Sequence, residues 1–141
     1  MRGYDMPDPQ ILGERVAIKD QIKYLGLELN RVLGFRAHLE AAEKKAQTTA
    51  VVLSRFMPNV GGTGQKKRRL LATVVESKIL YGSPIWVGAL VHQRNIDTIL
   101  RPQRVLALRT AMSYRTVLTA AVTVVAGIVS AHLLVCERSE K

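Results

Sequence analysis

The spacing of hydrophobic residues changes near Asn30 and divides the chain into an extended part and a helical part. Between residues 10 and 30, apolar residues form two short β-rich runs joined by a polar stretch. Such a pattern predicts one β-hairpin over residues 10–30. Gly26 within the second run predicts a bulge or a close backbone approach. Residues 1–9 contain two prolines and no apolar period, so we expect a loose leader there.

From residue 31 to residue 113 the apolar period is that of amphipathic helices. The first predicted helix has one apolar face, formed by Phe35, Leu39, Ala42, Ala46, Ala50, Leu53 and Met57. Pro58 disfavours helical geometry in the residue before it, and Gly61-Gly62 then allows a turn. Residues 31–113 are therefore expected to form a basic helical bundle.

Three further helices are expected within this bundle. The second begins near Thr63, whose side chain suits an N-cap. Its predicted buried residues are Leu70, Leu71, Val74 and Val75. The third begins at Ser83-Pro84, because proline is favoured in a first helical turn. It carries Ile85, Trp86 and Leu90, with Trp86 in the core. The fourth runs from about residue 95 to 112, and Pro102 is expected to kink or split it.

Residues 114–141 are expected to add a pair of apolar helices broken at Gly127. Residues 116–136 contain no Lys, Arg, Asp or Glu, and this length is sufficient to span a bilayer. A tail-anchored membrane protein with its span at 116–136 is therefore one alternative. Thr, Ser, Gly and His residues make the segment weakly hydrophobic, which favours two buried helices and no membrane partner. The predicted fold class is mainly α (α+β), a short N-terminal β-hairpin followed by a helical bundle.

Composition bounds the chemistry and the compartment. The chain has 141 residues, of which 48% are apolar, and this indicates a folded chain with one domain, or with one small domain plus appendages. Cys136 is the sole cysteine, so neither an intrachain disulfide nor a zinc cluster can form. Residues 1–10 lack the apolar run of a secretory signal. We expect an intracellular protein, with the nucleus as one possible location.

Positive charge is concentrated in the middle of the chain. The net charge is +10, and residues 31–115 carry fifteen Lys and Arg against four Asp and Glu. The flanking segments are close to neutral, with four cations against five acids before residue 31 and two against two after residue 115. A positive field confined to one segment is typical of a protein that binds a polyanion. A generic basic helical interaction module is the alternative.

Four consecutive cations form the sharpest local signal: Lys66, Lys67, Arg68 and Arg69. They fall in the first turns of the second predicted helix, where the macrodipole disfavours each cation by a few tenths to about 1 kcal/mol. Together with the Gly61-Gly62 turn and the helix N–H groups, they predict a site for nucleic-acid phosphates. A solvated charged face and a nuclear-import signal are the alternatives.

Two further residues are candidates for nucleic-acid contact. Tyr24 in the hairpin has an aromatic face on which a base can stack, and Arg115 follows the fourth helix within reach of a phosphate. The three histidines are too far apart in sequence for a local metal motif. No metal ligand and no catalytic residue is therefore expected.

Four short segments occur in a fixed order: Tyr24–Leu27, Arg55–Gly62 running into Lys66–Arg69, Leu80–Trp86, and Ser113–Thr116. Together they resemble the region just downstream of the catalytic palm in reverse transcriptases of LINE-type (non-LTR) retrotransposons, especially the group that inserts into ribosomal DNA. The resemblance covers roughly residues 22–138. It implies that residues 10–30 are the palm-edge primer grip, residues 31–113 are the thumb, and residues 114–141 begin the connection region.

The resemblance also implies a function. In this family the thumb clasps the duplex of template and growing strand, and the polymerase uses magnesium held by an Asp-Asp motif of the palm. The present sequence lacks that motif, so we expect an inactive fragment of an RNA-directed DNA polymerase that binds no cofactor. Its expected partners are an RNA–DNA or DNA duplex and the upstream palm and fingers. Departures from the family pattern, such as Thr63 and Pro102, suggest a truncated copy of a transposable element.

Overall fold

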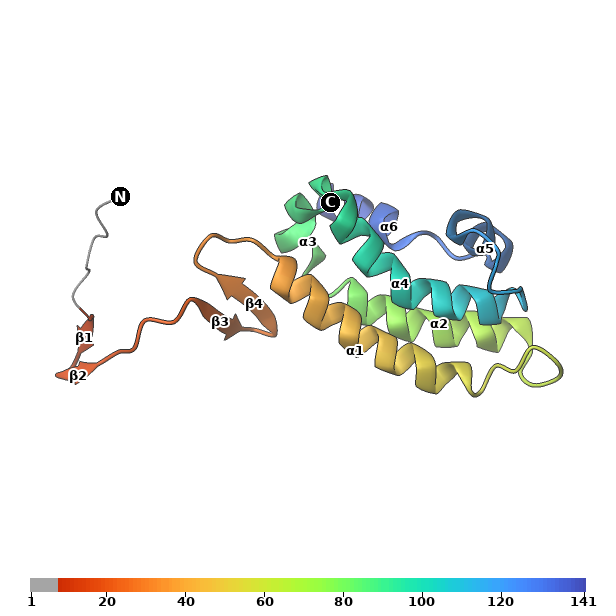
Figure 1. Ribbon diagram of the computed structural model, residues 1–141, viewed down its shortest axis with the longest axis horizontal. Coiled ribbons are helices and arrows are strands. Elements are labelled where there is room, and N and C mark those ends of the chain that lie inside the picture. The colour runs from red at the N-terminus through yellow and green to blue at the C-terminus, as the bar shows by residue number, and fades with distance from the viewer. Residues whose placement is uncertain (1–7) are drawn as a thin grey trace.

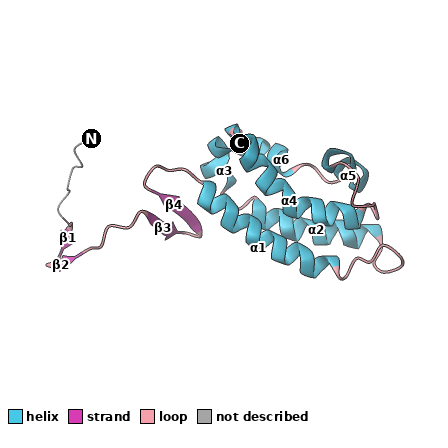
Figure 2. Ribbon diagram, viewed as in Figure 1, coloured by secondary structure: helices cyan, strands magenta, loops and turns pink. Residues whose placement is uncertain are grey.

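The computed structural model describes residues 8–141, and over that range the fold is mainly helical, as the sequence predicts (Figures 1 and 2). Two small β-hairpins precede the helices. The elements are β1 (Gln10–Ile11), β2 (Glu14–Arg15), β3 (Gln21–Tyr24), β4 (Leu27–Asn30), α1 (Arg36–Ser54), α2 (Gln65–Ile79), α3 (Ser83–Trp86), the 3-10 helix η1 (Val87–Val91), α4 (Gln93–Thr110), α5 (Thr119–Ala126) and α6 (Ala131–Ser139). Most of the leader expected over residues 1–9 lies outside the described residues.

The prediction of a single hairpin over residues 10–30 is wrong, because this segment forms two separate antiparallel hairpins. Each closes on a Leu-Gly pair with positive φ at both residues, 51° and 82° at Leu12-Gly13 and 48° and 83° at Leu25-Gly26. These signs are those of type I′ turns, which match the twist of two-residue hairpins. Gly26 is therefore a turn residue and not a bulge. Its backbone does approach another element closely, because an added Cβ would lie 3.1 Å from Cε1 of Tyr81.

Only the second hairpin is packed against the helices, and Figure 1 shows the first extending away from them. Leu27 is buried beside Gly82. The Tyr81 hydroxyl donates a 2.7 Å hydrogen bond to the Leu25 carbonyl. The Glu28 N–H donates to Nδ1 of His38 at 3.4 Å. Burial lowers the pKa of His38, with the nearby Glu28 carboxylate opposing the shift. The hairpin β3–β4 is thus attached near the start of α1.

Helices α1, α2 and α4 form the body of the bundle. The first turns of α1 and α4 line one cavity and their last turns line another, so the two helices run parallel (Figure 1). The core is apolar and includes Leu39, Ala46, Ala50, Met57, Val75, Ile79, Trp86, Ile99 and Leu106. The predicted apolar face of α1 and the core position of Trp86 are confirmed.

Two details of the helical predictions are wrong, and of the two outcomes expected at Pro102 the split helix does not occur. Gly64 and not Thr63 precedes α2, and the Thr63 hydroxyl donates to the Phe56 carbonyl at 3.2 Å. Leu70 and Val74 are exposed, because Arg68 takes the inward position on the face shared with Ala72, Val75 and Ile79. Pro102 does not split α4, which continues to Thr110. The proline lies on the buried face of that helix, where packing keeps the two halves together.

The C-terminal helix pair has the predicted break, because Gly127 adopts φ 66° after α5. Gln103 of α4 holds the link between α5 and α6: its Nε2 donates to the Val129 carbonyl at 2.7 Å, and its Oε1 accepts from the Ala131 N–H at 2.9 Å. The same amide nitrogen donates to the Glu76 carboxylate at 3.3 Å. Burial raises the pKa of Glu76, and this hydrogen bond opposes the shift.

No single helix within residues 8–141 has both the length and the hydrophobicity to cross a bilayer. Two neighbouring pairs reach that length only when joined, α2 with α3 and η1 across a 53° bend, and α5 with α6 across a 73° bend.

Candidate nucleic-acid interface

The four consecutive cations of α2 point in different directions. An α-helix turns by about 100° per residue, so four successive side chains surround most of its circumference. Lys66 and Lys67 are exposed, and Arg68 is completely buried. Arg69 donates from Nε to the Ala126 carbonyl at 3.2 Å and so caps the end of α5. The prediction that all four cations form one phosphate site is therefore wrong.

The buried Arg68 instead fastens the connection between α1 and α2 to the end of α4. Its Nε donates to the Thr63 carbonyl at 2.8 Å, and its Nη1 donates to the Arg109 carbonyl at 2.7 Å. Its Nη2 donates to the carbonyls of Pro58 and Gly61 at 2.6 and 3.1 Å. Four carbonyl oxygens thus satisfy the guanidinium, which makes its burial tolerable. Arg68 is a structural residue that shapes the adjacent surface.

A groove of about 540 Å³ lies beside this anchored loop. Its walls come from the end of α1, the loop that follows it, the second half of α4 and the corner after α4. It is lined by Val51, Ser54, Asn59, Arg104, Val105, Leu108, Arg109, Ser113 and Arg115. We call it the arginine groove, after Arg104, Arg109 and Arg115. No carboxylate lines it, so its charge is positive.

The three arginines of the arginine groove differ in what they bind. Arg104 donates from Nη1 to the Thr119 hydroxyl at 2.9 Å and from Nη2 to the Arg115 carbonyl at 2.7 Å. These bonds fix the corner that carries Arg115. The guanidinium groups of Arg109 and Arg115 make no hydrogen bond to residues within 8–141. The guanidinium groups of Arg109 and Arg115 are therefore unpaired, while Arg68 and Arg104 hold the backbone around them in place.

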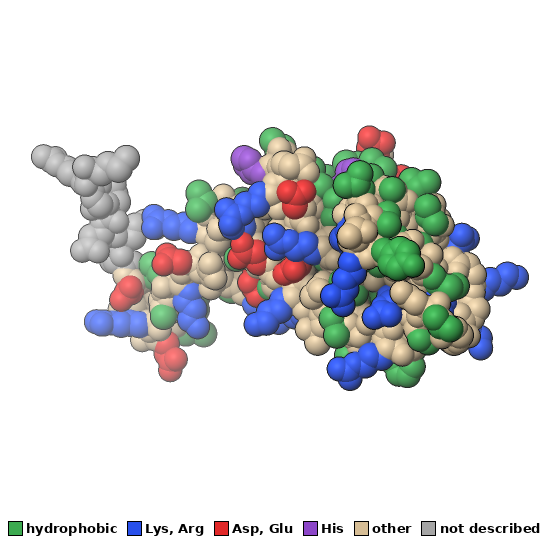
Figure 3. Space-filling view, turned by 45° about the vertical axis from the view of Figure 1, so that its right-hand side comes forward, with side chains coloured by type: hydrophobic (Ala, Val, Ile, Leu, Met, Phe, Trp, Pro, Cys, Tyr) green, Lys and Arg blue, Asp and Glu red, His purple; other side chains and the backbone are tan. Residues whose placement is uncertain are grey.

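The signal for this groove in the amino-acid sequence is weak. Arg115 was predicted as a phosphate contact and lies in the groove, whereas Arg104 and Arg109 were missed. Consecutive cations attract notice in a sequence, whereas Arg104, Arg109 and Arg115 are separated along the chain and reach one groove only through the fold. Figure 3 shows basic side chains spread over the helical body with few acidic ones among them.

The other predicted contacts stay apart from the arginine groove. Tyr24 is 61% exposed at the end of β3, and its hairpin is attached near the start of α1. The groove lies at the last turn of that helix, which is about 28 Å long at 1.5 Å per residue. Lys66 and Lys67 are exposed near the loop that Arg68 anchors, but they do not line the groove.

Metal chemistry has no candidate site in the described part of the chain. Among residues 8–141, no three His, Cys, Asp or Glu side chains gather closely enough to hold a metal ion.

Comparison of the chain with protein-family models, curated proteins and solved structures found no match.

Proposed function

We propose that the arginine groove binds the phosphate backbone of a nucleic-acid duplex. The observation that carries this proposal is the pair of unpaired guanidinium groups, Arg109 and Arg115, in a groove without a carboxylate. Guanidinium groups bind phosphate oxygens through two parallel N–H donors, and this makes arginine the preferred residue for such contacts. The resemblance to a reverse-transcriptase thumb supports the same assignment.

The two other arginines have positioning roles in this proposal. Arg68 holds the loop wall of the groove, and Arg104 holds the corner that presents Arg115. Lys66 and Lys67 add long-range attraction from the neighbouring start of α2. Because phosphate contacts carry no base information, binding is expected to be independent of sequence. The proposed partner is an RNA–DNA or DNA duplex, bound together with the palm and fingers of a LINE-type polymerase.

The proposal assigns duplex binding, and not nucleotide addition, to this chain. Nucleotidyl transfer requires two divalent metals held by closely placed carboxylates. The four aspartates of the sequence are scattered at positions 5, 8, 20 and 97. The parent enzyme of the proposal supplies the catalytic carboxylates from a separate palm.

A matched pair of double variants tests the proposal. Arg109→Gln with Arg115→Gln removes two charges from the arginine groove, and Lys44→Gln with Arg138→Gln removes two charges from exposed positions on α1 and α6. Binding of a fluorescent RNA–DNA duplex is measured by anisotropy at fixed salt. A hydrogen bond to a charged group contributes about 1.5–3 kcal/mol, so the groove variant should lose at least about tenfold in affinity.

The control variant should lose only the small long-range term, about threefold or less. Equal losses in the two variants would mean that total charge, and not the arginine groove, determines binding. Both variants alter exposed or half-buried side chains, so their melting temperatures should match that of the unmodified chain and exclude a folding defect.

A further inference from the structure

A second cavity, of about 640 Å³, lies at the opposite end of the bundle. It is formed where α1 and α4 begin, and its walls include η1 and Ile85 of α3. Its volume is within the range of small-molecule sites. We call it the N-terminal pocket, and its lining combines apolar residues with Arg36, His92, Arg94 and Asn95.

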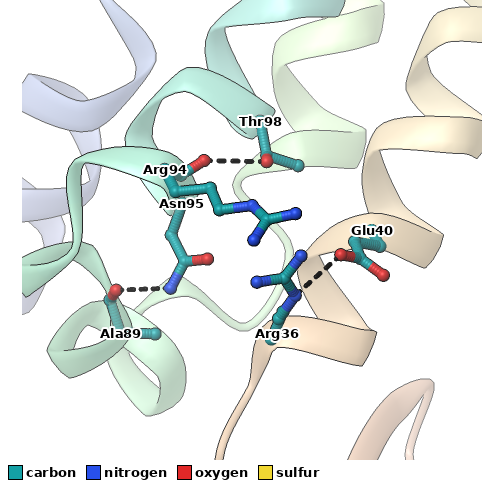
Figure 4. Close-up of polar contacts among 6 residues, drawn as sticks. All are labelled: Arg36, Glu40, Ala89, Arg94, Asn95 and Thr98. Atoms are coloured by element: carbon teal, nitrogen blue, oxygen red, sulfur yellow. Dashed lines mark hydrogen bonds and ion pairs between the residues drawn. The ribbon is translucent and has the colours of Figure 1, made fainter.

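Several sources of positive potential meet in the N-terminal pocket. Arg36 and Arg94 extend from different helices toward one another (Figure 4). Nε of Arg36 is 2.9 Å from the Glu40 carboxylate, whereas the Arg94 guanidinium makes no hydrogen bond within residues 8–141. Two neighbouring guanidinium groups with one carboxylate leave an unbalanced positive charge. An anion between them would balance it.

The backbone adds to this potential. Helices α1 and α4 both begin at the pocket, and neither has a side-chain cap or an acidic residue in its first turn. The uncapped N–H groups and the positive ends of two macrodipoles therefore face the same space. A helix start of this kind favours phosphate, and here two starts are combined with two arginines.

The remaining walls define what is attached to the anion. Phe35 and Ile85 line the pocket with apolar surface, and Ile85 is 57% exposed. An exposed apolar wall beside cations suits a ligand with a flat ring joined to a phosphate. Aromatic and guanidinium planes both stack on nucleobases.

Asn95 determines which hydrogen-bonding group the ring must present. The residue is only 8% exposed, and its Nδ2 donates a 2.7 Å hydrogen bond to the Ala89 carbonyl. That bond fixes which end of the amide is nitrogen, so Oδ1 is the free end (Figure 4). Oδ1 only accepts hydrogen bonds. It therefore selects a ring that presents an N–H donor, such as the exocyclic amine of cytosine or adenine.

We infer that the N-terminal pocket binds a nucleotide whose base carries an exocyclic amine. Its phosphate lies between Arg36 and Arg94, its base packs against Phe35 and Ile85, and its amine donates to Oδ1 of Asn95. The nucleotide has two possible sources, free solution or an unpaired end of a bound strand. Only the second source rests on the proposed duplex binding.

Calorimetric titration with CMP and UMP tests the inference. The two nucleotides differ along one edge of the ring: cytosine has an amine donor at C4 and an acceptor at N3, whereas uracil has an acceptor at C4 and an N–H donor at N3. CMP should bind at least about tenfold more tightly than UMP, because with the ring in the same position the C4 oxygen of uracil would face Oδ1 without a hydrogen bond. Cytidine, which lacks the phosphate, should bind more weakly than CMP by a similar factor.

Arg94→Gln and Arg101→Gln are matched variants, since both arginines are exposed on α4 and only Arg94 lines the pocket. CMP affinity should fall at least about tenfold in Arg94→Gln and stay unchanged in Arg101→Gln. Three results would overturn the inference: no CMP binding at about 5 mM, equal binding of CMP and UMP, or equal effects of the two variants.

A second arm distinguishes the two sources. Duplexes with an unpaired 5′-phosphorylated C or U are compared with blunt duplex, using the unmodified chain and Arg94→Gln. A preference for the C overhang that Arg94→Gln abolishes identifies the strand end as the source. CMP binding without that preference identifies the free nucleotide. Loss of duplex binding in the arginine groove variant, with CMP affinity retained, separates this pocket from the proposed function.

Discussion

Replacing Arg68 tests whether this cation is structural. Arg68→Gln removes a guanidinium whose four hydrogen bonds reach the carbonyls of Pro58, Gly61, Thr63 and Arg109. Glutamine is shorter and has one amide group, so it cannot reach acceptors on both the loop and the end of α4. Most of the four carbonyls would lose their charged donor, and a void would remain in a site that is fully buried.

The magnitude follows from these contacts. A hydrogen bond to a charged group contributes about 1.5–3 kcal/mol, but bonds within one network are not additive. Part of the loss is also recovered, because water can reach the exposed loop once it is released. We expect a fall in unfolding free energy of about 3–5 kcal/mol, comparable with the loss on breaking a buried ion pair. For a chain of this size that corresponds to a melting temperature lower by roughly 10–15 °C.

The control is the double variant Lys66→Gln, Lys67→Gln, which changes the two exposed neighbours in the same helix turn. Glutamine propagates a helix nearly as well as lysine, so its stability should stay within about 0.5 kcal/mol of the unmodified chain. Thermal unfolding, monitored by circular dichroism, measures the melting temperatures of the two variants, and urea unfolding measures their unfolding free energies. If Arg68→Gln melted as the control does, the guanidinium would not hold the loop.

Two further predictions concern stability. Burial raises the pKa of Glu76, so its stabilising contribution is complete below the ordinary value of 4.5 and is lost as pH rises through the folded-state pKa. The unfolding free energy of Glu76→Gln minus that of the unmodified chain should therefore be larger near pH 7 than near pH 4. If urea unfolding gave the same difference at both pH values, the prediction would be wrong. Gly61 and Gly62 both have positive φ, but only at Gly62 would an added Cβ lie 2.7 Å from the Pro58 ring. Gly62→Ala should thus lower the unfolding free energy by about 1–3 kcal/mol more than Gly61→Ala, and equal losses would show that the ring moves aside freely.

Much of the helical fold follows from local patterns. The apolar face of α1, the core position of Trp86 and the break at Gly127 all depend on period or on glycine, and they agree with the structure. The sequence does not predict two separate hairpins. Leucine rarely adopts positive φ, so Leu12 and Leu25 are expected in strands and not in turns.

The candidate site was harder to predict because it depends on tertiary contacts. The inward position of Arg68 requires four carbonyls, three from the loop before α2 and one from the distant end of α4, and no local pattern reports them. Because Arg68 points inward, a different face of α2 packs against the core than the one predicted, and Leu70 is exposed. The arginine groove forms only where the loop after α1 meets the end of α4. The place of Arg109 in the groove therefore follows from the tertiary structure and not from the local sequence.

The salt dependence of duplex binding tests the proposed function most directly. Each neutralised phosphate releases counterions, so log affinity falls with log salt at a slope of about −0.9 per contact on B-DNA. The unmodified chain should show such a slope on duplexes of unrelated sequence. The Arg109→Gln, Arg115→Gln variant should flatten it by about two units, because two contacts are lost. The Lys44→Gln, Arg138→Gln variant should leave it unchanged, and a groove variant with the slope of the unmodified chain would contradict phosphate binding in the arginine groove.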